Sequence, residues 1–475
     1  MEPGRGGVRC RRRLVLFLWG PRDEVAGECP WRAPGVLQGH RLPAVAWLLA
    51  LANRRFSGLL LIWSGVPIVL LYLWQALIQP LVFGSELGDF QGSYMRAAAR
   101  LASGRDPFDL CQAMGCLEPT GPQYVTPLPL AWLLQPVVGV DSHAVTMAAV
   151  LVLNASLAIF LFFCLRALRV RDWQMGLLLV LIALAFEPTT ANIVEGQINL
   201  VLLALSGVWL LAWIGDRWWG GVALGLAVAL KLIQAPVGLL LLWARRWAML
   251  AAAAVAGLGL WLLAAPQYLL EYLLKVVPAI GQGTGLFENH SPGGTIARLL
   301  EPETFLGAAR GAPVAARIIT ALIAVAAIVV TFWVLRSPAA SATGRGLEAA
   351  AAVAVTPLVA SYSWGTHLVL LLLPMLVLVA WAIPRRQWIV LGLIALGWLL
   401  IGPGHHLLQV LLVSGYSNLL LLRLMAEFGV IGIAAVWIAS LLAVRRERGQ
   451  RTDLIRLTST VPRNKNRTAL EKTTR

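Results

Sequence analysis

Charged residues are scarce in this chain of 475 residues. Only 13% of the residues are charged, whereas 59% are hydrophobic. This composition excludes an ordinary soluble domain and is typical of a polytopic membrane protein. The alternation of apolar and polar residues that marks a transmembrane β-barrel is also absent. We therefore predict an all-α fold with about 10–12 membrane segments.

Cysteine is sparse as well, with five residues in the whole chain. Cys111 and Cys116 share one loop, where the sequence is compatible with either a local disulfide or two free thiols. No residue spacing matches a metal site, so the sequence predicts neither a metal nor another cofactor. We find no internal repeat, which counts against the many transporters that are built from repeats.

Hydrophobic runs that are long enough, or nearly long enough, to cross a bilayer recur along the chain. A spanning helix needs about 20 apolar residues. The runs cover residues 57–79, 144–166, 175–187, 196–214, 247–265, 312–335, 347–362, 366–383, 387–402 and 418–444. Several of them are short, which indicates tilted helices, local bilayer thinning or helices that end inside the protein.

The net charge of +16 would suggest a nucleic-acid partner in a soluble protein. Here the basic residues gather in particular loops between the apolar runs, which is the pattern of cytoplasmic loops. These loops contain Arg54, Arg166, Arg217, Arg245, Arg336, Arg385 and Arg445. We therefore predict that both termini are cytoplasmic and that loops 80–126 and 266–310 lie outside.

Residues 219–244 need separate treatment because they carry basic residues at both ends and Lys231 in the middle. Two half-helices that form a re-entrant hairpin would keep the alternation of loops consistent. The alternative is a full span together with one misassigned loop.

The ends of the chain are basic and lie outside the predicted membrane domain 57–444. Residues 1–56 form a cytoplasmic arm in which 42–52 suit a helix at the membrane surface. The arm's Arg cluster precedes an apolar run too short for a signal peptide. Residues 445–475 have ten Lys or Arg against three Asp or Glu, which predicts a disordered tail near anionic headgroups.

The first outside loop begins with an amphipathic segment, residues 89–103. Phe90, Tyr94 and Leu101 recur at helical spacing, so we predict a helix that lies flat at the membrane interface. Asp89 begins this segment at the edge of the hydrocarbon, where a carboxylate is costly unless it has a partner or a task. It is either an ordinary helix N-cap or a functional acid with one oxygen left free.

Further polar residues lie in or beside apolar runs, mostly at the predicted outer ends. They are Glu195, Gln197, Asn199, Lys231, His290 and His367. Burying an unpaired polar group costs a few kcal/mol, so these side chains must pair, bind a ligand or line water. Lys231 suits a phosphate partner, but it could also extend its ammonium to the inner membrane surface. Glu195 fits a solvated loop carboxylate as well as a ligand contact.

Motifs placed between the spans resemble glycosyltransferase family 87 of the GT-C superfamily over residues 57–444. They are Gly88-Asp89-Phe90 with Tyr94, Gly104 through Phe108, Tyr124 through Pro129, Gly196 through Asn199, Lys231 with Pro236, Asn289-His290-Ser291, and Ser363 through His367. The last motif often has two adjacent histidines, whereas this chain has Thr366-His367.

The resemblance implies an enzyme that moves a hexose, typically mannose, from a polyprenyl-phosphate donor to an extracytoplasmic lipid or glycan acceptor. The chain is similar to polyprenyl-phosphate-mannose-dependent α-1,2-mannosyltransferases. The resemblance also implies that no metal is needed, that Asp89 is the base and that His367 contacts the donor phosphate or sugar.

The implied chemistry is physically coherent. Asp89 would take the proton of the acceptor hydroxyl while lipid phosphate leaves from the opposite face, so the configuration inverts. The leaving phosphate needs positive charge already in place, for which Lys231, His367 and Arg298 are the candidates. The predicted acceptor-binding or cavity-lining residues are Tyr94, Tyr124, Glu195, Gln197, Asn199, Asn289, His290 and Trp364.

Two other functions remain compatible with the sequence. A transporter or flippase of a lipid-linked or small solute would also need intramembrane polar groups and a broken hairpin. A structural or assembly protein is the third possibility. The sequence identifies neither the acceptor nor the linkage nor the oligomeric state.

Overall fold

The computed structural model describes residues 44–83, 87–108, 124–306 and 311–460. Internal contacts divide the chain into two units, Met1–Phe56 and Ser57–Arg475. Within the first unit, the described part is the beginning of one helix. Cys111 and Cys116, for which the sequence left a disulfide and two free thiols open, lie outside the described residues.

Every regular element in the described ranges is helical, which confirms the predicted all-α class. Seven helices within these ranges are long and apolar enough to cross a membrane, and a pair bent by 51° would add an eighth. The long helices are α1 (Ala44–Leu73) continued by α2 (Gln79–Phe83), α5 (Ser142–Ala167), α11 (Trp247–Ala264), α15 (Val314–Leu335), the 3₁₀ segment η8 (Gly365–Leu371) continued by α18 (Leu372–Ala382), α19 (Trp388–Ile401) continued by α20 (Pro403–Val413), and α21 (Leu419–Ala426) continued by α22 (Phe428–Thr460). The bent pair is α6 (Trp173–Leu184) and α7 (Glu187–Val194). The protein is therefore a multi-pass membrane protein.

Shorter helices complete the second unit. They are α3 (Arg96–Ala102), α4 (Pro129–Leu134), α8 (Asn199–Ile214), α9 (Gly220–Leu230), α10 (Gly238–Trp243), α12 (Leu269–Glu271), α13 (Val277–Gly281), α14 (Pro292–Leu300), α16 (Ala342–Ala354) and α17 (Thr356–Val359). Four irregular turns matter for the site, namely the π-helical turn η2 (Phe90–Met95) and the 3₁₀ segments η3 (Gln135–Val137), η4 (Leu232–Val237) and η8 (Gly365–Leu371).

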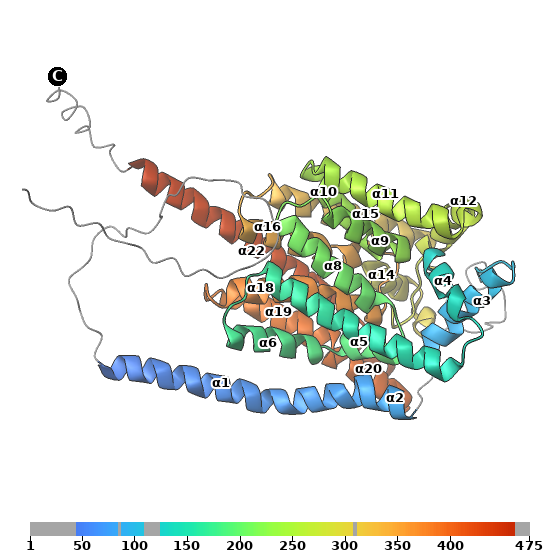
Figure 1. Cartoon of the computed structure of the whole chain (residues 1–475), viewed down its shortest axis with the longest axis horizontal. Coiled ribbons are helices and arrows are strands. Elements are labelled where there is room, and N and C mark those ends of the chain that lie inside the picture. The colour runs from blue at the N-terminus through green and yellow to red at the C-terminus, as the bar shows by residue number, and fades with distance from the viewer. Residues whose placement is uncertain (1–43, 84–86, 109–123, 307–310, 461–475) are drawn as a thin grey trace, which may run out of the picture. The chain divides into compact units, whose positions relative to one another are not determined.

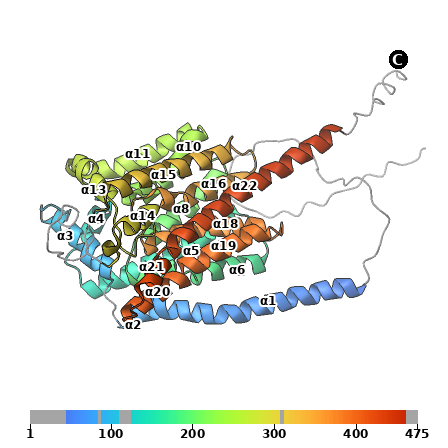
Figure 2. The ribbon, with the colours of Figure 1, turned by 180° about the vertical axis from the view of Figure 1, so that it is seen from behind.

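The helices of the second unit pack around three buried ones. α11, α9, α8 and α5 lie against one another in that order, and α16 contacts α8, α18 and α22 (Figures 1 and 2). Most side chains of α8, α16 and α18 are buried. Because protein surrounds α8 on several sides, it can be apolar all round. The small helices α3, α4 and α12 gather at one end of the bundle, opposite the projecting C-terminal part of α22 (Figure 1).

Two glycines of α9 let this helix lie directly on the backbone of α11. A Cβ at Gly221 would be 1.9 Å from the Met249 carbonyl oxygen, and one at Gly225 would be 2.1 Å from that of Ala253. The small-residue pair therefore serves packing within the chain. The two contacts also show that α9 and α11 run in the same direction.

The segment 219–244 turns back on itself. Its ends meet, because Asp216 forms an ion pair with Arg246. α9 runs alongside α11, and α10 then returns to the beginning of α11. The helix breaks at Lys231, whose backbone is extended with φ −160° and ψ 125°. This geometry is that of the predicted hairpin and not of a full span.

The basic loops meet at the end of the bundle near the projecting part of α22. Four arginines that follow helix ends adopt the left-handed conformation, with φ between 49° and 55°: Arg169, Arg245, Arg336 and Arg386. A left-handed residue closes a helix, and a cation beside a helix C-terminus is electrostatically favourable. Arg448 also contacts Glu348 at 3.5 Å across this end.

The tail prediction needs a correction, because α22 continues as a helix to Thr460 and disorder does not begin at residue 445. Glu447 accepts a hydrogen bond from Trp381 Nε1 at 2.9 Å and lies 3.6 Å from Arg385. These contacts extend the packed part of α22 beyond its apolar run. Residues 461–475 lie outside the described ranges.

Candidate active site

A glycine brings the segment that carries Asp89 against the loop 195–199. Gly196 has φ +71°, and a Cβ there would be 2.5 Å from Cβ of Phe90. The Glu195 carbonyl oxygen accepts hydrogen bonds from the N–H groups of Asp89 at 3.0 Å and Phe90 at 3.3 Å. The close approach requires a residue without a side chain, and this explains Gly196 in the motif.

The helix predicted over 89–103 is confirmed as η2 followed by α3. It begins with a π-helical turn, a rare local geometry that is frequent at functional sites. Gly104 follows its C-terminus with φ +69°. Asp106 forms a turn after this helix, because its Oδ1 accepts a hydrogen bond from Phe108 N–H at 2.9 Å.

The carboxylate of Asp89 is not a helix cap. Its side chain makes no capping hydrogen bond to the first turn. Instead, Oδ2 accepts a short hydrogen bond from Gln197 Nε2. Asp89 is partly exposed, and within the described ranges its Oδ1 has no hydrogen-bond partner. The interpretation of Asp89 as an ordinary N-cap is therefore wrong.

Gln197 connects this carboxylate to the lysine at the hairpin turn. Its Oε1 accepts hydrogen bonds from Lys231 Nζ at 3.0 Å and from the Tyr94 hydroxyl at 2.7 Å. Lys231 Nζ also donates to Asn199 Oδ1 at 3.0 Å. Five predicted site residues thus form one hydrogen-bonded network, although they come from three separate parts of the chain.

The network extends through buried amides toward His367. Asn199 donates to Asn192 at 2.9 Å, and Asn192 donates to the Thr366 carbonyl oxygen at 2.7 Å. His367 is 7% exposed, and its imidazole lies within electrostatic range of Lys231. The structure therefore places His367 beside the network.

Two further carboxyl groups lie near Asp89. Burial raises the pKa of Glu195 to about 8, and the charges of Asp89 and Glu288 add to this effect. The pKa of Glu288 is also raised, first by burial and then by Asp89. The sequence reasoning missed Glu288, although it directly precedes the Asn289-His290 motif. At neutral pH most of the Glu195 carboxyl is protonated, which limits the negative charge around Lys231.

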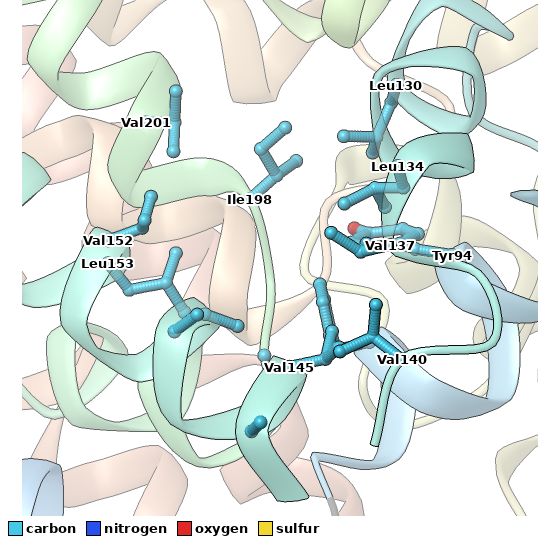
Figure 3. Close-up of a pocket in the computed structure, with 15 residues that line it drawn as sticks. Tyr94, Leu130, Leu134, Val137, Val140, Val145, Val152, Leu153, Ile198 and Val201 are labelled. Carbon is cyan, nitrogen blue, oxygen red and sulfur yellow. The ribbon is translucent and has the colours of Figure 1, made fainter. Parts of the chain in front are cut away.

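An apolar cavity of about 330 Å³ lies beside the polar network. Its walls come from α4 and η3, from α5, and from the start of α8, with Leu134, Val152 and Val201 among the lining residues (Figure 3). Tyr94 lines the cavity and hydrogen-bonds to Gln197, so this side chain belongs to both the cavity and the network. The volume falls within the usual range of ligand pockets.

In the described ranges Arg298 presents no free cation, because its guanidinium is paired within the protein, and its role as a phosphate ligand stays a prediction. Its Nε and Nη2 donate to the Glu427 carboxylate at 2.8 and 2.9 Å. Its Nη1 donates to the carbonyl oxygens of Leu286 and Asn289, and Nη2 also approaches Thr295 at 3.4 Å. These contacts use all five N–H groups of the guanidinium. The residue instead fixes the second loop to α21.

Asn289 and His290 also hold loops together and are not among the residues that line the apolar cavity, so their predicted contact with the acceptor stays a prediction. Asn289 Nδ2 donates to the Thr284 carbonyl oxygen at 2.8 Å, and its Oδ1 accepts from Ser363 N–H at 3.0 Å. The His290 ring packs edge-on against His405 at 4.5 Å, and both rings are buried. Burial lowers the pKa of His290 well below its usual value, so the imidazole stays neutral.

Tyr124 and Trp364 likewise stand outside the hydrogen-bonded network, and their predicted role as acceptor-binding or cavity-lining residues stays a prediction. The Tyr124 hydroxyl donates to the Pro127 carbonyl oxygen at 2.7 Å and accepts from Ala131 N–H at 3.3 Å. These bonds fix the beginning of α4. Trp364 packs against Tyr362 with 5.6 Å between the ring centroids.

In the described ranges, no group of three or more His, Cys, Asp or Glu side chains could hold a metal ion. The arrangement that is present consists of one carboxylate with a free oxygen, one ammonium held by two amides, a buried imidazole and an apolar cavity. Such a site can accept a proton and can stabilise an anion nearby.

Comparison with known proteins gives one family match. The model of glycosyltransferase family 87 matches residues 124–361. This range contains the loop 195–199 and Lys231, while Asp89 precedes it and His367 follows it. Among solved structures, ArnT from Cupriavidus metallidurans bound to undecaprenyl phosphate has a TM-score of 0.38 and 13% identity, covering 79% of this chain and 76% of that chain. No protein of curated function matches the chain.

Proposed function

This chain belongs to glycosyltransferase family 87 and is a membrane glycosyltransferase, and we propose that it transfers a hexose from a polyprenyl-phosphate donor to an extracytoplasmic lipid or glycan acceptor. Mannose is the hexose that the resemblance to the family implies. The single observation that carries the proposal is the network that joins Asp89 to Lys231 beside an apolar cavity.

In this proposal Asp89 is the general base. Its free Oδ1 takes the proton of the acceptor hydroxyl while the hydroxyl oxygen attacks the anomeric carbon. A positioned base of this kind contributes about 10²–10⁴ in rate. Attack and departure occur on opposite faces of the sugar, so the configuration at the anomeric carbon inverts.

Lys231 and His367 would stabilise the departing lipid phosphate. Within the described ranges, two of the three ammonium N–H groups of Lys231 have acceptors, which leaves one N–H for a phosphate oxygen. A charge-assisted bond to phosphate is stronger than a neutral one. The phosphate can leave as an anion, and no carboxylic acid has to protonate it.

The apolar cavity is suited to the first part of a prenyl chain. Its lining is almost entirely hydrophobic, and it adjoins the polar network at Tyr94, Phe90 and Gly196. A lipid phosphate could therefore have its head beside Lys231 and its chain among the side chains of α4 and α5. This accounts for the position of a transferase site within a membrane bundle.

For the orientation, we propose that the end carrying the basic loops faces the cytoplasm, together with both termini. Basic loops remain predominantly on that side of membranes. The site lies toward the opposite end, where α3 and α4 gather (Figure 1), so transfer would take place outside the cytoplasm.

The test is a transfer assay with purified protein in detergent, a prenyl-phosphate mannose donor and a panel of lipid acceptors, with products identified by mass spectrometry. We expect Asp89→Asn to lower the transfer rate by about 10²–10⁴. The matched control is Asp106→Asn, because Asp106 is an exposed turn residue on the same loop and asparagine can still accept from Phe108 N–H. If Asp89→Asn transfers sugar at the wild-type rate, Asp89 is not the base.

The same protein in sealed vesicles separates the enzyme from the transporter. An enzyme forms new glycosidic bonds in detergent, where no compartment exists. A transporter accumulates its unchanged substrate inside the vesicles and forms no bond in detergent. Accumulation without bond formation would contradict the proposed function.

A further inference from the structure

We infer that Gln197 is a positioning residue that binds Asp89 and Lys231 at once while keeping the two charged groups from pairing directly. This inference rests on the proposed function, since it concerns the base and the phosphate-binding cation of the transfer reaction. The observation behind it is that one buried amide bridges the carboxylate and the ammonium.

The orientation of the amide follows from its neighbours. An ammonium can only donate, and an ionised carboxylate can only accept. Gln197 must therefore present Oε1 to Lys231 and Nε2 to Asp89, as the structure has it. The Tyr94 hydroxyl donates to the same Oε1 at 2.7 Å, which fixes the oxygen further. No other amino acid side chain of this length offers one acceptor and one donor, except an unionised acid.

The amide prevents an ion pair that would disable both groups. A carboxylate bonded directly to an ammonium is a weaker base, because the cation stabilises its ionised form. The same ion pair would occupy the N–H of Lys231 that is left for phosphate. With Gln197 between them, each group makes a charge-assisted hydrogen bond to a neutral partner and keeps one atom free.

Gln197 itself is held on both sides. Its backbone N–H donates to the Asn192 carbonyl oxygen at 2.8 Å, and the residue is only 9% exposed. The preceding Gly196 is packed against Phe90, and the Glu195 carbonyl oxygen binds the backbone of Asp89. The loop therefore fixes Asp89 through its backbone and through its carboxylate.

The protonation of Asp89 during transfer would leave this contact intact. If the proton arrives on Oδ1, Oδ2 becomes a carbonyl oxygen that still accepts from Gln197 Nε2. Lys231 keeps its charge and its two amide acceptors while the phosphate leaves. The positioning role therefore holds before and after the proton transfer.

The experiment compares Gln197→Glu and Gln197→Met in the transfer assay across pH. Gln197→Glu puts a second carboxylate beside Asp89 and gives Lys231 a direct ionic partner. We expect the acid limb of its kcat/KM profile to move up by one pH unit or more, because like charges hold protons more tightly. Gln197→Met removes all three side-chain hydrogen bonds of Gln197, and we expect kcat to fall by about 10²-fold, the cost of misplacing a catalytic group.

The matched control is Gln234→Met. Gln234 is a buried glutamine of η4 that donates to Ser206 at 2.6 Å, and this hydrogen bond involves neither Asp89 nor Lys231. We expect Gln234→Met to lower the melting temperature as Gln197→Met does, and to leave the pH profile where the wild type has it. A merely structural role of Gln197 would make the two methionine variants alike.

Two results would overturn the inference. One is a Gln197→Glu profile that superposes on the wild type, together with a Gln197→Met variant that resembles Gln234→Met. The other is a fully active Asp89→Asn variant, which removes the base that Gln197 is said to position. The first result leaves the proposed function standing, whereas the second contradicts its mechanism, so the two failures can be distinguished. If Gln197→Glu does not fold, the comparison of Gln197→Met with Gln234→Met still decides whether Gln197 positions the two charged groups or has a merely structural role.

Discussion

Gly196 lies against Phe90 so closely that a Cβ on the glycine would be 2.5 Å from Cβ of the phenylalanine. We expect Gly196→Ala to push the segment around Asp89 away from the loop 195–199. Overpacking of this kind costs about 1–3 kcal/mol, and a displacement of about 1 Å at a catalytic group can cost 10²-fold in rate. The melting temperature and the transfer rate of the purified variant measure the two effects.

Gly104→Ala is the control for this substitution. Gly104 has nearly the same backbone, with φ +69°, but no atom lies within 4 Å of the position where its Cβ would be. Alanine there should carry only the left-handed backbone penalty of roughly 1–2 kcal/mol. Equal losses of transfer rate in the two alanine variants would show that the contact with Phe90 is unimportant for the site.

The sequence predicted those features that depend on neighbouring residues. The helix after Asp89, its end near Gly104 and the turn at Asp106 all follow from local spacing and turn residues. The hairpin 219–244 could be predicted because both of its ends are basic, and charge placement reports the side of the membrane. The lengths of the hydrophobic runs predicted the long helices for the same reason, because the length of a run depends only on neighbouring residues.

The sequence could not predict which polar residues find partners within the protein. Arg298 and Lys231 look alike in sequence, because each is a cation near an apolar run. Arg298 meets Glu427, which is 129 residues away, and loses its free donors. Lys231 meets two neutral amides and keeps its charge available. Pairing over such distances depends on the packing of helices, and one sequence does not determine it.

The apolar cavity gives a prediction about the lipid chain of the donor. Ala148 of α5 lines the cavity, and a tryptophan there would fill part of its volume. We expect Ala148→Trp to raise KM for a long-chain prenyl donor more than for a donor with a single prenyl unit. Ala251→Trp is the control, because Ala251 is exposed on α11 and does not line this cavity. An equal fold change in KM for both donors on going from the wild type to Ala148→Trp would place the chain elsewhere.

The raised pKa of Glu195 gives a prediction about stability and pH. The folded protein keeps this proton up to a pKa of about 8, whereas the unfolded chain loses it near the usual 4.5. Between these values the folded state binds more protons, so stability falls as pH rises through the window. Glu195→Gln cannot lose a proton, and its melting temperature should therefore fall less than that of the wild type between pH 5 and pH 8.

Glu303→Gln is the control for this pH series, because Glu303 is an exposed carboxylate near the second loop. Its melting temperature should follow the wild type across the whole range. If Glu195→Gln also runs parallel to the wild type, the Glu195 carboxyl is already ionised in the folded protein at neutral pH.

Because Arg298 pairs with Glu427, we expect substitution of either residue to lower the stability of the protein and to leave donor binding unchanged. The Arg298 side chain is 3% exposed, and removing one member of a buried ion pair costs about 3–5 kcal/mol. Arg298→Met and Glu427→Met should each lower the melting temperature, and the double variant should lose less than the sum of the two. Lys275→Met, which breaks an exposed pair with Glu271, should change the melting temperature little.

A phosphate-binding role would instead make Arg298→Met raise KM for the donor at an unchanged melting temperature, an effect that Glu427→Met would not reproduce. The comparison of the two single variants therefore decides whether Arg298 fixes the loop or binds the substrate.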